Sequence, residues 1–190
     1  MQADSGRIFP LRQRGFTLGE LLTTVAIVGV SLSMVVPSLA SITRSNQRAG
    51  AINELVTTLQ IARSEAITRN TRVAICPSTE GKTCSRTSWD AGWIRFVDAD
   101  GDFGIGAGES VLGVVPALEG QSIRTDSFDE AVGYTGTGQV TVPGGRTGGG
   151  DFTFCPPGDG PGTVVILSPV GKVALSHQRL NGRTPDCSAG

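Results

Sequence analysis

Four carboxylates near the middle of the chain have the spacing of ligands in a calcium-binding loop. With Asp98 counted as the first position, Asp100 and Asp102 fall at the third and fifth positions, and Glu109 falls at the twelfth. These are ligand positions of an EF-hand loop. The sixth position is Phe103, where the EF-hand needs a glycine, and strand-like rather than helical patterns flank the segment. A hairpin turn rich in Asp and Gly is therefore the favoured interpretation, and weak binding of calcium, the one cofactor that the residues suggest, stays open.

No other group of residues has the composition of a catalytic site. His177 is the only histidine, so a nucleophile–His–acid arrangement would have to use it, and no Gly-x-Ser-x-Gly motif accompanies it. Zinc is disfavoured because the sequence has no Cys-x-x-Cys and its histidine is distant from every cysteine. The glycine-rich segment 143–150 lacks the Lys-Ser/Thr of a phosphate-binding loop. We therefore expect a protein that is not an enzyme.

The N-terminal part of the chain combines a basic leader with a long apolar segment. From Phe16 to Thr43 the only charged side chain is Glu20. A helix over 16–40 would be about 37 Å long, enough to cross a bilayer core of about 30 Å. An unpaired carboxylate there costs at least about 2.5–3.5 kcal/mol, so Glu20 is expected to face a partner. The leader arginines place the N-terminus in the cytoplasm and the rest of the chain on the other side.

The charge balance excludes a generally basic protein. Without the leader, the 16 basic and 17 acidic residues of the chain become 13 and 16, which is a formal net charge of −3. Such a chain has no overall attraction to nucleic acid or to an anionic membrane surface. Any binding of DNA would need a local group of basic residues.

The junction between leader and apolar segment, Arg14-Gly15-Phe16-Thr17-Leu18-Gly19-Glu20, resembles the class III signal of type IV prepilins and type II secretion pseudopilins. The resemblance implies that a dedicated prepilin peptidase cuts between Gly15 and Phe16 and then methylates the new amino group of Phe16. Glu20 is the fifth residue of the mature chain, where the family carries a glutamate that attracts the N-terminus of the neighbouring subunit during assembly. Gly19 departs from the family's usual bulky aliphatic residue. A secretory signal peptide fits less well because Glu20 interrupts the apolar stretch at its start.

A second resemblance lies further along the chain. The run Leu59-x-x-Ala62-Arg-Ser-Glu-Ala66, then Cys76, then Gly92-Trp93-Ile94-x-Phe96-x-Asp98, is similar to GspH/FimT-type (FimT/FimU-like) minor pilins and pseudopilins. It implies an α+β, type IV pilin-like fold. A long N-terminal helix, with a transmembrane half and an amphipathic half, would pack on an antiparallel β-sheet with a loop-rich C-terminal part. The expected divisions are a cleaved leader (1–15), a transmembrane or filament-core helix (16–43) and a periplasmic domain (44–190).

Periodicity places the helix and the strands. The residues Ile52, Leu55, Leu59, Ala62 and Ala66 recur at spacings of three and four, which predicts one face of an amphipathic helix ending near residue 70. Strands are predicted at 71–76, 94–97, 110–118, 121–125, 131–134, 136–142, 151–155, 163–168 and 172–176. The last two form a hairpin around the turn Ser168-Pro169-Val170-Gly171. Segment 143–150 is expected to be a glycine-rich loop.

Four cysteines in a periplasmic domain favour two disulfides. Three pairings are open. In one of them, the neighbours Cys76 and Cys84 close a short loop, which leaves Cys155 with Cys187. The chain-entropy model assigns these two loops about 2.6 and about 3.7 kcal/mol of stabilisation.

The expected function is that of a non-catalytic minor pilin, which helps to initiate assembly of a type IV pilus and sits at or near the filament tip. It would be a single-pass protein of the bacterial inner membrane and then of the pilus or pseudopilus. Its partners would be other minor and major pilins or pseudopilins, the prepilin peptidase and the inner-membrane assembly platform. One alternative is a minor pseudopilin of a type II secretion system.

The other alternative is a DNA-binding minor pilin for natural transformation. Members of the family that act in DNA uptake use a basic tail with a Gly-Arg-x-Arg pattern, and here the tail reads Gly-Arg-Thr-Pro from Gly182, without the second arginine. The candidate contacts are Arg146, Lys172, Arg179 and Arg183. These four basic residues could neutralise only a few phosphates. Binding of DNA would therefore be weak and strongly dependent on salt.

Overall fold

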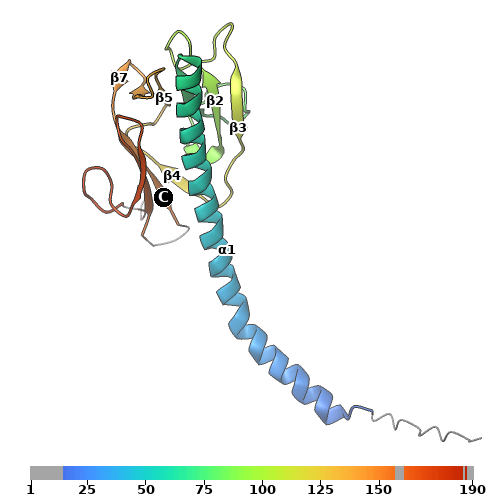
Figure 1. Cartoon of the computed structure of the whole chain (residues 1–190). Coiled ribbons are helices and arrows are strands. Elements are labelled where there is room, and N and C mark those ends of the chain that lie inside the picture. Colours follow the sequence, from blue (N-terminus) through green and yellow to red (C-terminus); the bar gives the residue numbers. More distant parts are fainter. Residues whose placement is uncertain (1–14, 157–160, 186, 188–190) are drawn as a thin grey trace, which may run out of the picture. The chain divides into compact units, whose positions relative to one another are not determined.

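The structure, a computed structural model, describes residues 15–156, 161–185 and 187, and the side chains of 34–41 lie outside the described part. The chain divides into two compact units, Met1–Arg44 and Ser45–Gly190. One helix, α1 (Leu18–Arg69), supplies residues to both units, and the described strands all belong to the second (Figure 1). Helix and antiparallel strands together confirm the predicted α+β class.

In the first unit, α1 begins at Leu18 because Thr17 caps it. The N–H of Glu20 donates to Thr17 Oγ1 over 3.3 Å, and the N–H of Leu21 donates to the Thr17 carbonyl oxygen over 3.1 Å. Among the described residues, no helix carries an apolar stretch of sufficient length to traverse a bilayer. The segment predicted to span the membrane, 16–43, includes residues 34–41, whose side chains lie outside the described part.

The second unit contains two antiparallel sheets rather than the single sheet that was expected. The first has the order β3-β2-β1-β5-β6-β7 and the second the order β10-β9-β8-β4. The first sheet consists of β1 (Val73–Pro77), β2 (Trp93–Val97), β3 (Val111–Val115), β5 (Val132–Tyr134), β6 (Val140–Val142) and β7 (Arg146–Thr147). The second consists of β4 (Ser122–Arg124), β8 (Gly150–Cys155), β9 (Thr163–Leu167) and β10 (Val173–Ser176), and a short 3-10 helix, η1 (Trp89–Ala91), precedes β2. The pattern of a strand shows that one face is buried but not which strand lies beside it, so the division into two sheets was not predictable.

The apolar face predicted for the second half of α1 forms the seam of the core. Its five residues, Ile52, Leu55, Leu59, Ala62 and Ala66, are all buried, which confirms the prediction. They belong to one cluster with residues of both sheets, among them Ile75, Tyr134, Phe152 and Val165. The helix ends at Arg69 because Asn70 adopts the left-handed conformation (φ 49°) typical of a helix C-terminus.

The C-terminal hairpin also follows its prediction. Strands β9 and β10 pair in antiparallel register, and the N–H of Gly171 donates to the carbonyl oxygen of Ser168 over 2.8 Å, which closes the turn. The expectation of a glycine-rich loop over 143–150 was wrong in part, because the short strand β7 pairs with β6 there and β8 begins at Gly150. A two-residue strand is held by backbone hydrogen bonds and is too short to show an alternation of hydrophobic side chains, so the sequence pattern could not predict it.

Candidate functional site

The residues of the predicted cleavage and assembly signal lie at the start of α1. Gly15 and Phe16 precede the helix, and the Phe16 side chain is 80% exposed. Glu20 lies in the first turn, where the positive end of the helix dipole favours a carboxylate. Within the described part of the chain, no basic side chain forms an ion pair with Glu20.

The hydroxyl groups in this part of α1 are satisfied by the helix itself. Those of Thr23 and Thr24 donate to carbonyl oxygens three residues earlier, over 3.0 and 2.9 Å. Those of Ser31 and Ser33 donate to the carbonyl oxygens of Ile27 and Val30 over 2.8 and 2.7 Å. Polar groups that are bonded within their own helix carry a lower cost in an apolar environment. These four hydroxyl groups therefore need no partner from outside their own helix.

Both disulfides are formed in the second unit. Cys76 bonds Cys84, and Cys155 bonds Cys187. This is the pairing in which the neighbouring cysteines close the short loop. The first disulfide ties the end of β1 to the loop after it, and the second ties the C-terminal segment to the end of β8.

The four predicted calcium ligands do lie in one loop, but several of their carboxylate oxygens already accept hydrogen bonds from backbone N–H groups. Ligand atoms of Asp98, Asp100 and Asp102 lie within 4.8 Å of one another. The N–H of Gly101 donates to Asp98 Oδ1 over 2.9 Å, and that of Gly104 donates to Asp102 Oδ1 over 2.6 Å. Both carboxylate oxygens of Glu109 accept N–H groups of the same loop, from Ala99 and Gly106, over 2.7 Å each.

An arginine that the sequence analysis did not consider supplies a positive charge to this loop. Arg72 Nη1 lies 3.5 Å from Asp98 Oδ2, and its guanidinium lies 5.4 Å from the centroid of the Phe103 ring. A Cβ at Gly101 would collide with the same guanidinium. Phe103 has φ 61°, so it adopts the conformation that an EF-hand reserves for glycine at this position. The loop closes around a protein cation, which favours the interpretation as a structural turn.

Calcium is therefore expected to leave the stability of the protein unchanged. A site with a Kd of about 1 mM would add about 1.4 kcal/mol at 10 mM calcium, which a thermal unfolding curve resolves easily. The measurement compares the Tm of the full chain in calcium, in magnesium and in chelator. A rise in Tm that continues with the calcium concentration, and that magnesium does not reproduce, would contradict the structural interpretation.

Asp98 is expected to make the stability depend on pH. Its side chain is fully buried, and this burial raises the pKa of Asp98 above its ordinary value of 3.8, although Arg72 and the loop N–H groups act in the opposite direction. A carboxyl group whose pKa is higher in the folded state than in the unfolded state stabilises the fold when it is protonated. Its contribution is present below pH 3.8 and is lost as the pH rises through the folded-state pKa.

The Asp98→Asn variant tests this dependence, because it keeps an oxygen acceptor but cannot ionise. We expect the free energy of unfolding of the wild type, relative to that of the variant, to fall as the pH rises above 3.8. The measurement is a series of denaturant titrations from about pH 3.5, near the ordinary pKa of an aspartate, up to about pH 7. A difference that is constant with pH, or that grows with pH, would contradict the raised pKa.

Carboxylates lie near two of the four basic residues that were considered as contacts for DNA. Arg179 Nη1 lies 2.6 Å from Asp126 Oδ2, and its Nε donates to Asp151 Oδ1 over 2.9 Å. Burial disfavours the charge of Arg179, but the bonds to Asp126 and Asp151 outweigh it and raise the pKa. Arg146 lines a hollow with Asp126, Asp129 and Glu130. Two of the four candidates are thus accompanied by carboxylates, which weakens the hypothesis of DNA binding.

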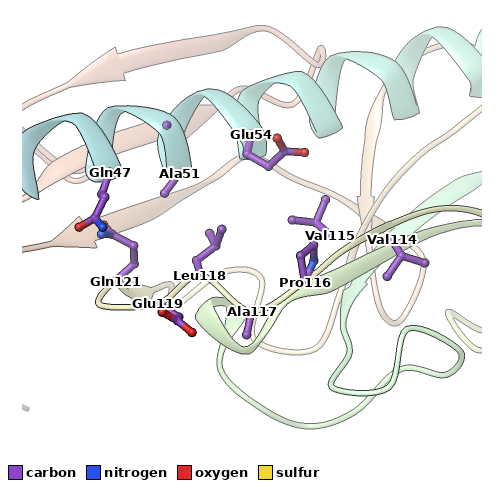
Figure 2. A pocket seen from close by; sticks show the side chains of 11 residues that line it. Gln47, Ala51, Glu54, Val114, Val115, Pro116, Ala117, Leu118, Glu119 and Gln121 are labelled. Carbon is purple, nitrogen blue, oxygen red and sulfur yellow. The ribbon is translucent and has the colours of Figure 1, made fainter. Parts of the chain in front are cut away.

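A groove beside the second half of α1 was not predicted. A groove of about 490 Å³ separates α1 from the segment that follows β3. Figure 2 shows Gln47, Ala51 and Glu54 on the helix side and Leu118 pointing toward the helix from the opposite wall. Because its walls are about 65 residues apart in the sequence, no local pattern could have indicated this groove.

Comparison with known proteins gives a family match and two structural matches. The sequence model of the family described as type II transport protein GspH matches residues 51–171. A crystal structure of the type IV minor pilin FimU from Pseudomonas aeruginosa PAO1, in space group P21, is 23% identical, with a TM-score of 0.57. The match covers 77% of this chain and 98% of that one.

The second match is FimU in space group P65, at 21% identity and a TM-score of 0.50, covering 73% of this chain and 98% of that one. No curated protein matches the sequence. At these identities the two structures show a shared fold.

Proposed function

This chain belongs to the GspH family of minor pilins and pseudopilins, and from this premise we propose that it is a minor pilin that helps to initiate assembly of a type IV pilus, at or near the filament tip. The observation that carries the proposal is the combination of a family domain over 51–171 with an exposed helix start, where Glu20 forms no ion pair with any residue that the structure describes. In the proposal, the first half of α1 inserts in the inner membrane and then in the filament core.

The geometry of the helix start supports a role in recruiting subunits. A carboxylate in an apolar segment is strongly favoured to meet a positive group, because ionised groups are poorly solvated there. Cleavage after Gly15 would create such a group, the amine of Phe16, on every subunit. The Glu20 carboxylate of one subunit and the Phe16 amine of its neighbour would then attract each other while both helices are in the membrane.

Assembly of pilins is a packing reaction and needs no catalytic group. We therefore propose that the protein is non-catalytic and that it works without a cofactor. Its partners in the proposal are other pilins, the prepilin peptidase and the assembly platform of the inner membrane. Head-to-tail packing of parallel helices, which does not close on itself, generates an open filament.

A pseudopilin of a type II secretion system is the second candidate function. The family description itself, type II transport protein, favours it. Both functions use the same signal and the same kind of domain, so they differ in the machine that the subunit joins. The likeness of the fold to a type IV minor pilin leads us to place the pilus first.

The experiment that separates the two measures surface pili sheared from a strain that lacks this gene, with and without a plasmid copy. Loss of pili, restored by the plasmid, is the expected result. Secretion of exoproteins is measured in the same strains. Unchanged pili together with lost secretion would reject the pilus assignment in favour of the pseudopilin, and unchanged pili with unchanged secretion would reject both.

Replacement of Gly15 tests the proposed processing. A Gly15→Val variant is expected to remain as uncut precursor, because a branched side chain at the cleavage position would not fit a peptidase site shaped for glycine. Immunoblotting of membranes would show a band larger than the mature protein by the 15-residue leader. Gly148→Val serves as the matched control, because no atom lies within 4 Å of the place where a Cβ of residue 148 would be. Mature-sized Gly15→Val protein would contradict the class III signal.

A further inference from the structure

The outer edge of β3 is open to one more strand. β3 is at one end of the first sheet, and no described strand pairs with its outer side. Its five residues, Val-Leu-Gly-Val-Val, include no charge and no proline, and Val111 and Val114 are 37% and 54% exposed. The unpaired backbone groups of such an edge are a template for a strand from another chain, which natural proteins usually block.

The other three edge strands that the structure describes have this kind of protection. β4 and β7 have three and two residues, and each includes an arginine. β10 has four residues and follows directly on the exposed Lys172. Short strands and basic side chains at an edge discourage pairing with another chain. Among the described edges, that of β3 is therefore the best suited to accept a strand.

The groove beside α1 continues from this edge. Val114 and Val115, the last two residues of β3, line the groove together with the segment 116–118 (Figure 2). Leu112 and Val115 pack against the cluster that contains the buried face of α1, so this is the face of the sheet that the helix covers. In an added strand, every second side chain would point to that face, because side chains alternate between the two faces of a sheet. Those side chains would enter the groove.

The charge of the groove indicates what these side chains are. Glu54 and Glu119 both line it and are exposed, and neither forms an ion pair with a described residue. Ile61, which is 40% exposed, follows Glu54 by seven residues, or about two turns, and so lies on the same side of α1. A surface with apolar walls and unpaired acids is complementary to a segment that combines apolar side chains with a lysine or arginine.

We propose that the edge of β3 accepts an extended segment of a different pilin subunit, which adds a strand to the first sheet and places a lysine or arginine beside Glu54 and Glu119. Main-chain hydrogen bonds supply the affinity of such a contact, and the side chains in the groove supply its selectivity. The class of the partner rests on the proposed function, because a minor subunit at the filament tip has other pilins as its neighbours.

Photo-cross-linking of the full-length chain in its native strain tests the contact. The photoreactive residue p-benzoylphenylalanine replaces Val111 in one strain and Ala117 in another, and mass spectrometry locates the attachment points. Both positions are expected to mark one segment of another pilin, which includes a lysine or arginine. Val111 and Ala117 are six residues apart. Attachment points roughly five to seven residues apart would indicate an extended partner, whereas a helix would need about 13 residues for the same span.

The matched control places the same photoreactive residue at Leu175, which is 60% exposed on the edge strand β10. This strain should yield little of the product obtained at Val111. Equal yields of that product from Leu175 and Val111 would overturn the proposal. So would attachment points with helical spacing, or attachment only to a second copy of this chain or to proteins that are not pilins.

Charge reversal tests the expected base in the partner. In the Ala117 strain, Glu54→Lys together with Glu119→Lys is expected to lower the yield roughly twofold to fivefold, as for partly exposed ion pairs. Asp129→Lys is the control, since this exposed acid lies beside Arg146 of β7, at the opposite edge of the first sheet. A yield that is insensitive to the double reversal would overturn the charge pairing.

Backbone methylation of the partner segment tests the added strand itself. The cross-linked segment is made as a synthetic peptide in two versions, N-methylated at one or the other set of alternate residues. In a strand, alternate N–H groups point to the same side, so one version should bind the full chain in detergent about tenfold or more weakly, and the other should bind like the unmodified peptide. Equal affinities of the two versions would overturn the strand addition.

The outcome for pili keeps this contact separate from the proposed function. The absence of any cross-linked pilin in a strain whose pili require the protein would reject the contact and leave the function. The expected product in a strain whose pili do not need the protein would support the contact and reject only the function.

Discussion

Replacement of Leu59 by alanine is expected to lower the free energy of unfolding by about 2–5 kcal/mol. Leu59 has no exposed surface and lies in the cluster that joins α1 to both sheets. Truncation removes apolar contacts and leaves a cavity at the seam, where helix and strands cannot close the gap without moving relative to one another. Since a small domain is stable by about 5–15 kcal/mol, this single change would remove a large share of the total.

The two tryptophans report this effect directly. Trp89 and Trp93 are the only tryptophans of the chain, and both are buried in the same cluster as Leu59. Their fluorescence during urea unfolding of the full chain in detergent would give the transition midpoint. The matched control is Ile61→Ala, two residues away on the same helix but 40% exposed, which should cost much less. Equal losses for the two variants would contradict the assignment of the buried face.

Replacement of Glu20 by alanine is expected to abolish assembly while it leaves processing of the leader intact. Glu20 makes no ion pair within the described residues, so its loss removes no bond that the fold needs. In the membrane, however, the carboxylate would provide the charge that attracts the amine of a neighbour. The measurements are the size of the protein in membranes and the amount of sheared pili in the complemented deletion strain.

Two further variants separate charge from helix stability at this position. Glu20→Gln keeps the length and hydrogen-bonding capacity of the side chain, so a loss of pili equal to that of Glu20→Ala would assign the effect to the charge. Glu80→Ala removes another exposed carboxylate, outside α1, and should leave pili unchanged. Normal pili in the Glu20→Ala strain, with normal processing, would remove the proposed recruiting role.

Features that depend on neighbours in the sequence were predictable. The spacing of Leu55, Leu59 and Ala62 identified the buried face of α1, since residues three and four apart lie on one side of a helix. The Ser168–Gly171 turn was predictable because Pro and Gly restrict and permit particular backbone angles. The periodicity also placed the end of the helix near residue 70, and Asn70 there adopts the positive φ that this residue type tolerates.

Features that depend on distant contacts were not predictable. In the sequence, the Asp98 loop consists of four carboxylates, with Phe103 at the position where an EF-hand has glycine. The sequence could not show that Arg72, from before β1, would lie over that ring and beside Asp98. It likewise proposed Arg179 as a DNA contact, although the fold brings Asp126 and Asp151 to its guanidinium. Ion pairs between elements follow from packing, which no spacing rule encodes.

By itself, the sequence of this protein determined the strand-forming segments and the amphipathic half of α1, because each is a local pattern of side chains along the backbone. Only the tertiary structure decided which strands pair, that two sheets share one core, and that a groove opens between α1 and the segment after β3. These properties arise from contacts such as that of Arg63 with Val170, 107 residues apart, whose partners meet only when the hydrophobic core closes.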